Sequence, residues 1–477
     1  MIRATAGTWL NYATTILMQV LFAARFGTSA GAGAFVICFV SAVSISGVLV
    51  TTSSTVVMPK MLDPSGALKR NALRILLGLA VIIGAIALLA ALASVELGSA
   101  VASITGIEKS LAARMVLLAA ALVAIFGIAG LLVTVALALG QRFVPAIAPA
   151  FPSSSVVAYL FATPNPSLLG TLAALALGGL AQGIVLLVAI SMASPRVADG
   201  QPLRVTAAAG QMLSVLVLLA LLPPLQRALG GALDPSGIAQ LDYATRSTQA
   251  AQQLLIGGLL LTVLPDWAHK AQSLRALRRH VASTVSLVGL ALFACGAIAL
   301  VAAPELTAVA FQRGAFSAED TEAVATVVRA MSPGFVAEGL TLILVQALFA
   351  TNRSALVARA GLARVAVQGT LSVILGVALG ALGVAIAYSA SMVVVLIVTG
   401  IMALRTVIDP RDVGLVQRAG LAGLAPWAVG GLLMVAGWDG NVVLTLVAVL
   451  VAAGSGAALL CRREIVELLH ASRTAES

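Results

Sequence analysis

The sequence contains little charge and few aromatic side chains. Only 10% of its 477 residues are Asp, Glu, Lys or Arg, and 4% are Phe, Trp or Tyr. Soluble globular domains carry about 25% charged residues, so the composition excludes a water-soluble enzyme of this length. Hydrophobic residues make up 60% of the chain and the mean hydropathy is +1.08, which also excludes a disordered or fibrous chain. The protein is therefore expected to lie in a lipid bilayer.

Cysteine and histidine are scarce, with three residues of each. Cys38, Cys295 and Cys461 lie in or at the edge of apolar runs without a CxxC pair, and the histidines are scattered. Neither a disulfide framework nor a metal site is predicted. An integral-membrane enzyme is not expected either, because it needs paired carboxylates or a metal cluster in a loop. The nearest approach to such a pair is Asp409 and Asp412, which flank a proline without other acidic or metal-binding residues.

Long unbroken apolar runs, such as Leu76–Ala93 and Val442–Cys461, dominate the chain. A membrane-spanning helix needs about 20 apolar residues, whereas a barrel strand needs about 10 of alternating polarity, so these runs predict helices. Turn residues and charges divide the chain into 14 such segments, of which the fifth is interrupted by three prolines. The predicted limits are 5–26, 33–58, 73–94, 112–139, 144–163, 168–193, 204–223, 239–265, 281–303, 321–349, 357–379, 381–404, 419–437 and 441–461.

Basic residues outnumber acidic ones by 28 to 18. They form no compact patch with interleaved aromatic residues, so nucleic acid is not an expected partner. With the N-terminus inside, 21 of the 28 basic residues fall on the inner side, and these include Arg353, Arg359 and Arg364 around the start of the eleventh segment. Lys and Arg concentrate in cytoplasmic loops, so both termini are expected to be cytoplasmic.

Two pairs of matching segments indicate an internal repeat. ALALGQR at 136–142 resembles ALFATNR at 347–353, and VVMPK at 56–60 resembles TVLPD at 262–266. Each pair relates one helix to the sixth helix after it, which predicts a parallel repeat of the kind found in transporters. The predicted boundaries are 1–200 for a first six-helix lobe, 201–410 for a second, and 411–477 for helices 13 and 14 with a cytoplasmic tail. The expected fold class is thus an all-α integral membrane protein with about 14 transmembrane helices.

Four segments resemble the MurJ (MviN-type) lipid II flippases of the multidrug/oligosaccharidyl-lipid/polysaccharide exporter superfamily. The most specific is LTAVAFQRGAFSAEDTEA at 306–323, which is similar to the segment before the tenth helix of that family. The others are AARFGTSAGAGAF at 23–35, ALGQRFVPAIAPAF at 138–151 and LDYATRSTQAAQQLLIGGLLLTVLP at 241–265. The resemblance implies two lobes around a central cavity, with a groove for a polyprenyl tail at helices 13 and 14.

The same resemblance implies a function in peptidoglycan biosynthesis. The expected cargo is a polyprenyl-pyrophosphate-linked precursor similar to lipid II, moved from the inner to the outer leaflet of the bacterial cytoplasmic membrane by alternating access. The expected partners are membrane lipids, this precursor and cell-wall synthesis proteins. No cofactor is expected, and coupling to the membrane potential, H+ or Na+ stays open. The alternatives are an exporter of another lipid-linked glycan or amphiphile, a cation-coupled drug antiporter on the same fold, and a non-transporting scaffold.

Arg246 is the leading candidate for contact with the cargo. It matches the arginine of the family's eighth helix, and Gln249 matches the polar residue one turn later. Guanidinium groups bind phosphate oxygens through paired N–H groups, which suits a pyrophosphate. The alternative is an arginine at the outer interface that Asp242 neutralises. The family's first-helix arginines are absent, and Asn11 and Gln19 are the candidate cavity residues in that stretch.

Further charged residues are candidates at the two ends of the helices. Arg25 and Arg313, on the expected outer side, are candidate cavity ligands. Arg142 and Arg353 close the two matching segments and are either cytoplasmic gate residues or membrane anchors.

Glu338 is isolated within the tenth segment. A charge inside a span costs about 2.5–3.5 kcal/mol, so its presence needs an explanation. It is either a coupling group for a proton or sodium ion, or a structural carboxylate bonded to a neighbouring helix. Just before that segment, Ser317 is followed three residues later by Asp320, which predicts a helix N-cap.

Overall fold

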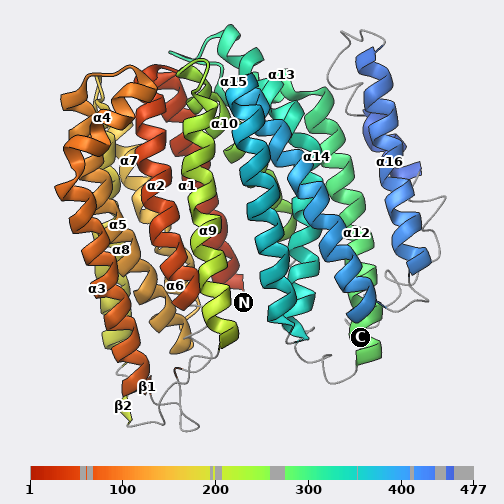
Figure 1. The fold of residues 1–477 in the computed structure, drawn as a ribbon, viewed down its shortest axis with the longest axis horizontal. Helices are drawn as coiled ribbons and strands as arrows, with labels where there is room; N and C mark the ends of the chain where they lie inside the picture. Colours follow the sequence, from red (N-terminus) through yellow and green to blue (C-terminus); the bar gives the residue numbers. More distant parts are fainter. Residues whose placement is uncertain are drawn as a thin grey trace. The chain divides into compact units, whose positions relative to one another are not determined.

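The structure, a computed structural model, describes residues 2–53, 61, 68–193, 197–198, 207–257, 274–351, 353–408, 413–435 and 447–455. Nearly all of these residues are helical (Figure 1). A helix satisfies its own backbone N–H and C=O groups, which find no partner in hydrocarbon. The expected all-α class is thereby confirmed.

The chain forms two compact units. The first holds Met1–Tyr243, Phe311–Asp320 and Gly376–Ala381, and the second holds Ala244–Ala310, Thr321–Leu375 and Leu382–Ser477. Two short pieces from the second half of the sequence therefore belong with the first unit. The lobe boundaries at residues 200 and 410 stay a prediction.

Most of the first unit consists of helices from the first half of the sequence. They are α1 (Ile2–Phe26), α2 (Ala30–Thr52), α3 (Arg70–Leu92), α4 (Ser94–Thr105), α5 (Lys109–Ala138), α6 (Phe143–Ile147), α7 (Ala150–Ala162), α8 (Leu168–Met192) and α9 (Ala207–Gly230). The short strands β1 (Leu68–Lys69) and β2 (Val197–Ala198) pair in parallel at the end of this unit opposite α4 (Figure 1).

Helix α5 is the centre of the first unit, because α2, α3, α4 and α8 all pack against it. Half of its 14 buried residues are small, namely Ala112, Ala119, Ala120, Gly127, Ala129, Gly130 and Ala136. Lipid tails are as apolar as leucine, so helices in a bilayer associate through close packing, and small residues allow that approach. The prolines of the fifth predicted segment divide it into α6 and α7, as the sequence predicts.

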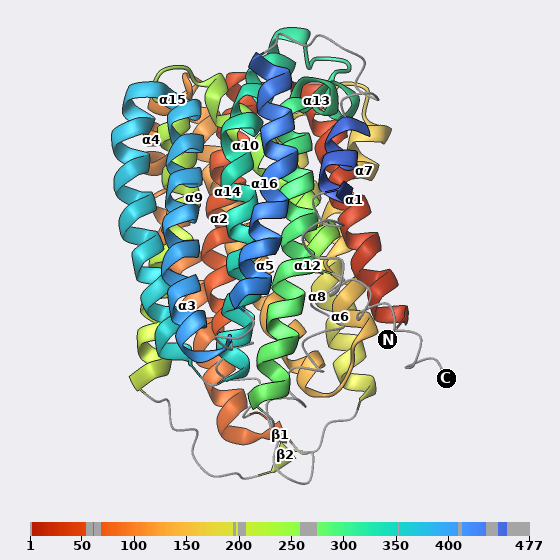
Figure 2. The ribbon, with the colours of Figure 1, turned by 90° about the vertical axis from the view of Figure 1, so that its right-hand side faces the viewer.

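The second unit is built from the remaining helices. They are α10 (Ser236–Gln252), whose first residues belong to the first unit, the π-helical turn η3 (Gln253–Gly257), α12 (Leu274–Val301), α13 (Ala303–Phe311), α14 (Ala318–Ala350), α15 (Ser354–Thr406) and α16 (Val413–Val435). Residues 447–455 are also helical. Helices α12 and α16 lie side by side (Figure 2). The unit's buried core includes Leu292, Phe335 and Ile343.

Helix α15 consists of two predicted segments rather than one. Its backbone leaves the helical conformation at Gly380, with φ +57° and ψ −134°, in the gap between the predicted limits 379 and 381. With this division, each of the 14 predicted segments corresponds to a helix or part of one among the described residues. Eight segments of the described chain are individually long and apolar enough to cross a membrane.

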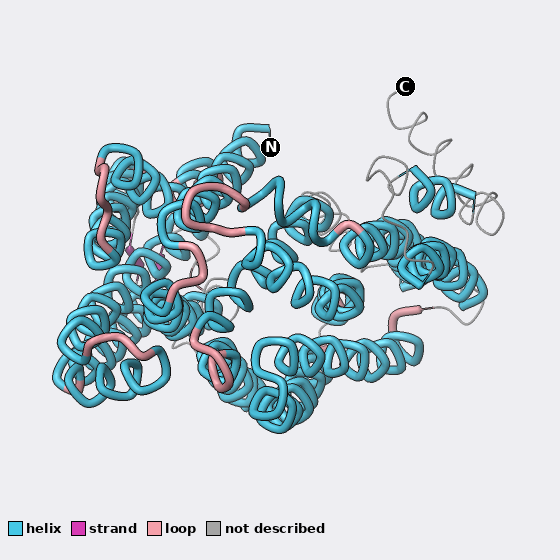
Figure 3. Tube along the Cα trace, turned by 90° about the horizontal axis from the view of Figure 1, so that it is seen from above, coloured by secondary structure: helices cyan, strands magenta, loops and turns pink. Residues whose placement is uncertain are grey.

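The order of long and short helices occurs twice, which agrees with the predicted repeat. The short helix α4 comes between the long α3 and α5 in the chain, and the short helix α13 comes between the long α12 and α14. Seen from above, the helices of the described residues are joined by short loops (Figure 3). The sequence does not predict these two short helices. Both stretches, SVELGSAVASIT and APELTAVAF, carry a glutamate in the first turn and are too short for a membrane span.

Candidate functional site

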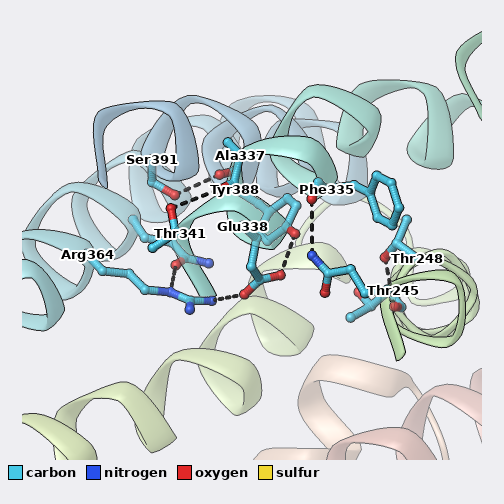
Figure 4. Close-up of polar contacts among 11 residues, drawn as sticks. Thr245, Thr248, Phe335, Ala337, Glu338, Thr341, Arg364, Tyr388 and Ser391 are labelled. Atoms are coloured by element: carbon cyan, nitrogen blue, oxygen red, sulfur yellow. Dashed lines mark hydrogen bonds and ion pairs between the residues drawn. The ribbon is translucent and has the colours of Figure 1, made fainter. Parts of the chain in front are cut away.

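Glu338, on α14, contacts two residues of α15. Its Oε1 lies 3.0 Å from Nη2 of Arg364, and the Tyr388 hydroxyl donates to its Oε2 at 2.7 Å (Figure 4). Arg364 and Tyr388 lie on opposite sides of the break at Gly380, so one carboxylate joins both halves of α15 to α14. The Nε of Arg364 also donates to Oε1 of Gln368 at 3.0 Å. Each oxygen of the Glu338 carboxylate therefore has a partner on α15.

The Glu338–Arg364 pair lies well inside the helices. Arg364 follows Ser354, the first residue of α15, by ten positions, which is about 15 Å at the helical rise per residue. The side chain of Arg364 is 31% exposed and that of Glu338 is 18% exposed. The charge count of the sequence assigns Arg364 to the cytoplasmic side. This assignment stays a prediction, and the ion pair with Glu338 gives the charge of Arg364 a reason other than orientation.

A proline interrupts α14 five residues before Glu338. Pro333 has no N–H, which interrupts the backbone ladder of α14. In the next position, the N–H of Gly334 donates to Oγ of Ser389 at 3.1 Å, and that hydroxyl donates to the carbonyl of Ala330 at 2.6 Å. A side chain of α15 thus stands between the two groups that would bond directly in a regular helix.

Close approach of α15 to α14 depends on Gly334. A Cβ at this position would lie 2.5 Å from a ring carbon of Tyr388 and 2.8 Å from the Cα of Ser389. Tyr388 and Ser389 are neighbours in sequence, so the contact that completes the ladder of α14 also presents the Tyr388 hydroxyl to Glu338.

A second polar site lies in the first unit, in the segment Phe311–Asp320, which we call the α13–α14 turn. The N–H of Ala315 donates to the carbonyl of Ala24 near the end of α1, at 2.8 Å. The Thr28 hydroxyl donates to the carboxylate of Asp320. The turn therefore binds the connection between α1 and α2, more than 280 residues away in the sequence.

Two glycines allow the backbones to meet at this point. Gly314 has φ +63° and Gly27 has φ +56°, a region that residues with a Cβ rarely adopt. A Cβ on Gly314 would lie 2.2 Å from the carbonyl oxygen of Ala24, and one on Gly27 would lie 2.5 Å from that of Ala315. Neither position has space for a side chain.

Aromatic packing completes the α13–α14 turn. The ring of Tyr243 on α10 lies 5.3 Å from that of Phe311 and 5.5 Å from that of Phe316, while its hydroxyl donates to the carbonyl of Gly27 at 2.9 Å. Ser317 and Asp320 bond reciprocally, because the Asp320 N–H donates to Oγ of Ser317 and the Ser317 N–H donates to Oδ2 of Asp320. This confirms the predicted N-cap of α14.

Asp242 forms a buried ion pair with Arg227 of α9. The Nη2–Oδ1 distance is 3.2 Å, and the two side chains are 6% and 5% exposed. From the sequence, Asp242 is expected to neutralise Arg246, and Arg227 falls between the predicted segments 204–223 and 239–265. Helix α9 continues through Pro223 and Pro224 to Gly230, which brings Arg227 to the last helical turn.

The remaining candidates lie apart from the Glu338 site along the chain. On α10, Arg246 is half-buried and Gln249 is exposed. On α1, Asn11 is half-buried, Gln19 is 9% exposed, and Arg25 donates to the carbonyls of Leu160 and Pro164 at the end of α7. Arg313 is exposed in the α13–α14 turn, and Arg142 and Arg353 are exposed immediately before α6 and α15. The roles assigned to these residues stay predictions.

The sequence analysis missed Arg364 and Tyr388 as partners of Glu338. A signal was present in Arg364, which lies inside the predicted segment 357–379 and so needed a counter-ion in the membrane. Among the described residues, no group of three or more His, Cys, Asp or Glu side chains is placed to hold a metal ion.

A family model and a similar solved structure both concern lipid II flippase MurJ. The model of the family described as lipid II flippase MurJ matches residues 23–450. No curated protein sequence matches significantly. The structure of "Lipid II flippase MurJ, inward closed conformation" is similar with a TM-score of 0.75 and 14% identity, over 98% of this chain and 100% of that one.

Other solved structures share the fold more distantly. A multidrug resistance MATE family transporter of the MOP superfamily, in an inward-facing conformation, has a TM-score of 0.60 and 14% identity over 85% of this chain and 94% of its own. A MOP superfamily transporter from Pyrococcus furiosus has a TM-score of 0.59 and 13% identity over 87% and 95%. Because the family model spans most of the sequence, the chain belongs to the lipid II flippase MurJ family.

Proposed function

We propose that the protein moves a polyprenyl-pyrophosphate-linked precursor of the lipid II type from the inner to the outer leaflet of the bacterial cytoplasmic membrane. The observation that carries the proposal is the match to the lipid II flippase family over residues 23–450. The multi-pass helical fold supports it, because a lipid with a large polar headgroup needs a protein path across hydrocarbon. Both termini lie on the cytoplasmic side in this proposal, and cell-wall synthesis proteins are its natural partners.

Alternating access requires one end of the path to close while the other opens. The α13–α14 turn provides a closure, since it joins Ala24 and Thr28, at the end of α1, to the start of α14. We assign this closure to the outer side, following the charge distribution of the loops. Transport then requires the turn to separate from α1 in the outward-open state.

The headgroup contacts follow from charge and position. Arg246 is the main phosphate ligand, with Gln249, Gln19 and Asn11 as polar contacts, because a guanidinium offers paired N–H groups to phosphate oxygens. Arg25 and Arg313 contact the cargo near the outer side, and Arg142 and Arg353 guide anionic headgroups at the inner side. Glu338 is the candidate for coupling to a cation, with the membrane potential as the other source of energy. No cofactor takes part.

Export of a different amphiphile is the second candidate. It is favoured by the first helix, in which Asn11 and Gln19 occupy the stretch where the family has arginines. A drug antiporter on the same fold and a scaffold without transport are the further alternatives.

Transfer in reconstituted vesicles tests the proposal. Purified protein is expected to speed the exchange of labelled lipid II between leaflets, and to leave a neutral polyprenol with the same sugar unmoved. Expression of the protein is also expected to rescue a flippase-depleted bacterium, and Arg246→Ala to abolish that rescue at unchanged protein level. Arg114→Ala, at an exposed position of α5, is the matched control. Failure of the unaltered protein in both assays contradicts the flippase proposal and favours export of another amphiphile.

A further inference from the structure

Arg364 lies on the same face of α15 as the buried Ala360 and Gln368, and opposite to a stripe of exposed apolar side chains. The stripe consists of Leu362 (47%), Val373 (46%) and Val377 (58%), while Ile374 and Leu379, nearer to the break at Gly380, are also exposed. At 3.6 residues per turn, positions two before, nine after and thirteen after Arg364 lie on the other side of the helix. The 31% of Arg364 that is exposed therefore faces away from this apolar stripe.

A partly exposed guanidinium in this position indicates that water reaches it. Exposure of a charged side chain to hydrocarbon at mid-span is costly, and such residues face a bundle interior or a water-filled space. Helix α14 supports this, since among its described side chains around Glu338, from Met331 to Val345, only Leu342 is exposed. The Glu338–Arg364 pair thus borders the interior of the protein rather than the lipid.

We propose that Arg364 is a binding residue for the phosphate of the anionic cargo, and that Glu338 is its resting counter-ion, which the cargo displaces. This inference rests on the proposed function, because it names a group of this chain that the lipid-linked pyrophosphate contacts. It adds a site on α14 and α15 to the candidate cargo contacts on α1 and α10.

The contacts of the guanidinium leave one edge available. Nε donates to Gln368 and Nη2 forms the ion pair with Glu338, while no contact of Nη1 is found among the described residues. A phosphate binds a guanidinium through two adjacent nitrogens. The cargo therefore uses Nη1 and competes with Glu338 for Nη2. Gln368 is only 2% exposed and keeps hold of Nε, so the plane of the guanidinium stays fixed during the exchange.

Tyr388 determines where the displaced carboxylate remains. Its hydroxyl bonds to Oε2, the oxygen that Arg364 does not use, so Glu338 stays beside the guanidinium after losing Nη2. A carboxylate next to the bound phosphate repels it. Competition from Glu338 therefore lowers the affinity for cargo, which favours release.

Binding to the full-length purified protein in detergent tests this site. The probes are undecaprenyl pyrophosphate and undecaprenol, which share the chain and differ in charge. We expect Arg364→Gln to weaken binding of the pyrophosphate at least tenfold, about 1.4 kcal/mol, and to leave undecaprenol binding unchanged. Glu338→Gln is expected to strengthen pyrophosphate binding several-fold, because the competitor is gone. Arg359→Gln, at an exposed position of the same helix, is the matched control and stays within twofold of the unaltered protein.

Opposite signs for the two variants distinguish a binding site from a structural ion pair. A purely structural pair predicts that Glu338→Gln and Arg364→Gln both lower thermal stability and both weaken binding, and this result overturns the proposal. If either single variant fails to fold, the neutral pair Glu338→Gln with Arg364→Gln replaces it. The double variant must then lose the preference for pyrophosphate over undecaprenol.

The unaltered protein separates this inference from the proposed function. If it shows no preference for the pyrophosphate lipid, the flippase proposal fails and the site fails with it. If it prefers the pyrophosphate and Arg364→Gln keeps that preference, only the site at Arg364 is overturned.

Discussion

The α13–α14 turn and the Glu338 site both join segments that are distant in the sequence, but by different means. The turn relies on a backbone hydrogen bond, Ala315 N–H to Ala24 C=O, and on glycines that leave no room for a Cβ. The Glu338 site relies on long side chains that are 18% and 31% exposed. Shape determines the first contact and charge determines the second.

This difference has a consequence for how each contact responds to change. A backbone contact without space is either made or lost, which suits a closure with two states. A partly exposed ion pair exchanges partners at small cost, since exposed charge pairs contribute only about 0–1 kcal/mol. The following predictions test this division, from the largest expected effect to the smallest.

A covalent link across the α13–α14 turn is expected to abolish transport. Thr28→Cys with Asp320→Cys, in a background without the native cysteines, places two thiols where the native side chains touch. Oxidation or a short bifunctional reagent then prevents separation of the turn from α1. Lipid exchange in vesicles measures the effect, and a reductant restores transport of the disulfide-linked form. Full transport by the linked protein contradicts a closure role.

Gly314→Ala is expected to lower stability by at least about 2 kcal/mol, because left-handed backbone strain adds to a clash with Ala24. Gly106→Ala is the matched control, since Gly106 has φ +76° and no atom lies within 4 Å of the place that its Cβ would take. Thermal unfolding in detergent gives the difference between the two variants. Equal losses mean that strain alone matters and that the contact with α1 is not tight.

Ser389→Ala is expected to cost about 1–2 kcal/mol, because it leaves the Gly334 N–H and the Ala330 carbonyl unpaired in a buried site. Ser391→Ala is the control. Ser391 is fully buried on the same helix, but its hydroxyl donates to a carbonyl of its own helix, that of Tyr388. Similar unfolding temperatures for the two variants show that Ser389 does not stabilise the backbone of α14 at Pro333.

Two tyrosine variants compare the sites directly, and each is expected to cost about 1 kcal/mol through one lost hydrogen bond. Tyr388→Phe releases Glu338 from its place beside the guanidinium, so the carboxylate moves away from the bound phosphate and affinity for undecaprenyl pyrophosphate rises by about twofold. Tyr243→Phe removes the bond to Gly27 in the α13–α14 turn and leaves that affinity unchanged. A change in affinity for both variants, or for neither, removes the distinction between the two sites.

The order of helices was accessible from the sequence because apolar runs and turn residues are local signals. The prolines of α6 and α7, the break at Gly380 and the Ser317–Asp320 cap all depend on residues close together in the chain. The short helices α4 and α13 escaped prediction, because their polar first turns are typical of loops.

The partners of the charged residues were not accessible in the same way. Asp242 pairs with Arg227 and Glu338 pairs with Arg364, each on a different helix. The rotation of one helix against its neighbour decides which side chains meet, and periodicity within a single helix does not contain that information. Gly314, the glycine of FQRGAF, was recognisable as part of a motif, but its contact with Ala24 was not.

The position of the Ser389 hydroxyl makes the backbone of α14 around Pro333 depend on the second half of α15. If the second half of α15 turns or slides, this hydroxyl moves away from the Gly334 N–H and the Ala330 carbonyl of α14. Leaving these two groups without a hydrogen bond costs several kcal/mol in the absence of water. The two helices are therefore expected to move together at this contact. Because Tyr388 is the neighbour of Ser389 in the sequence, a motion that breaks the contact of Ser389 with α14 also displaces the hydroxyl that binds Glu338.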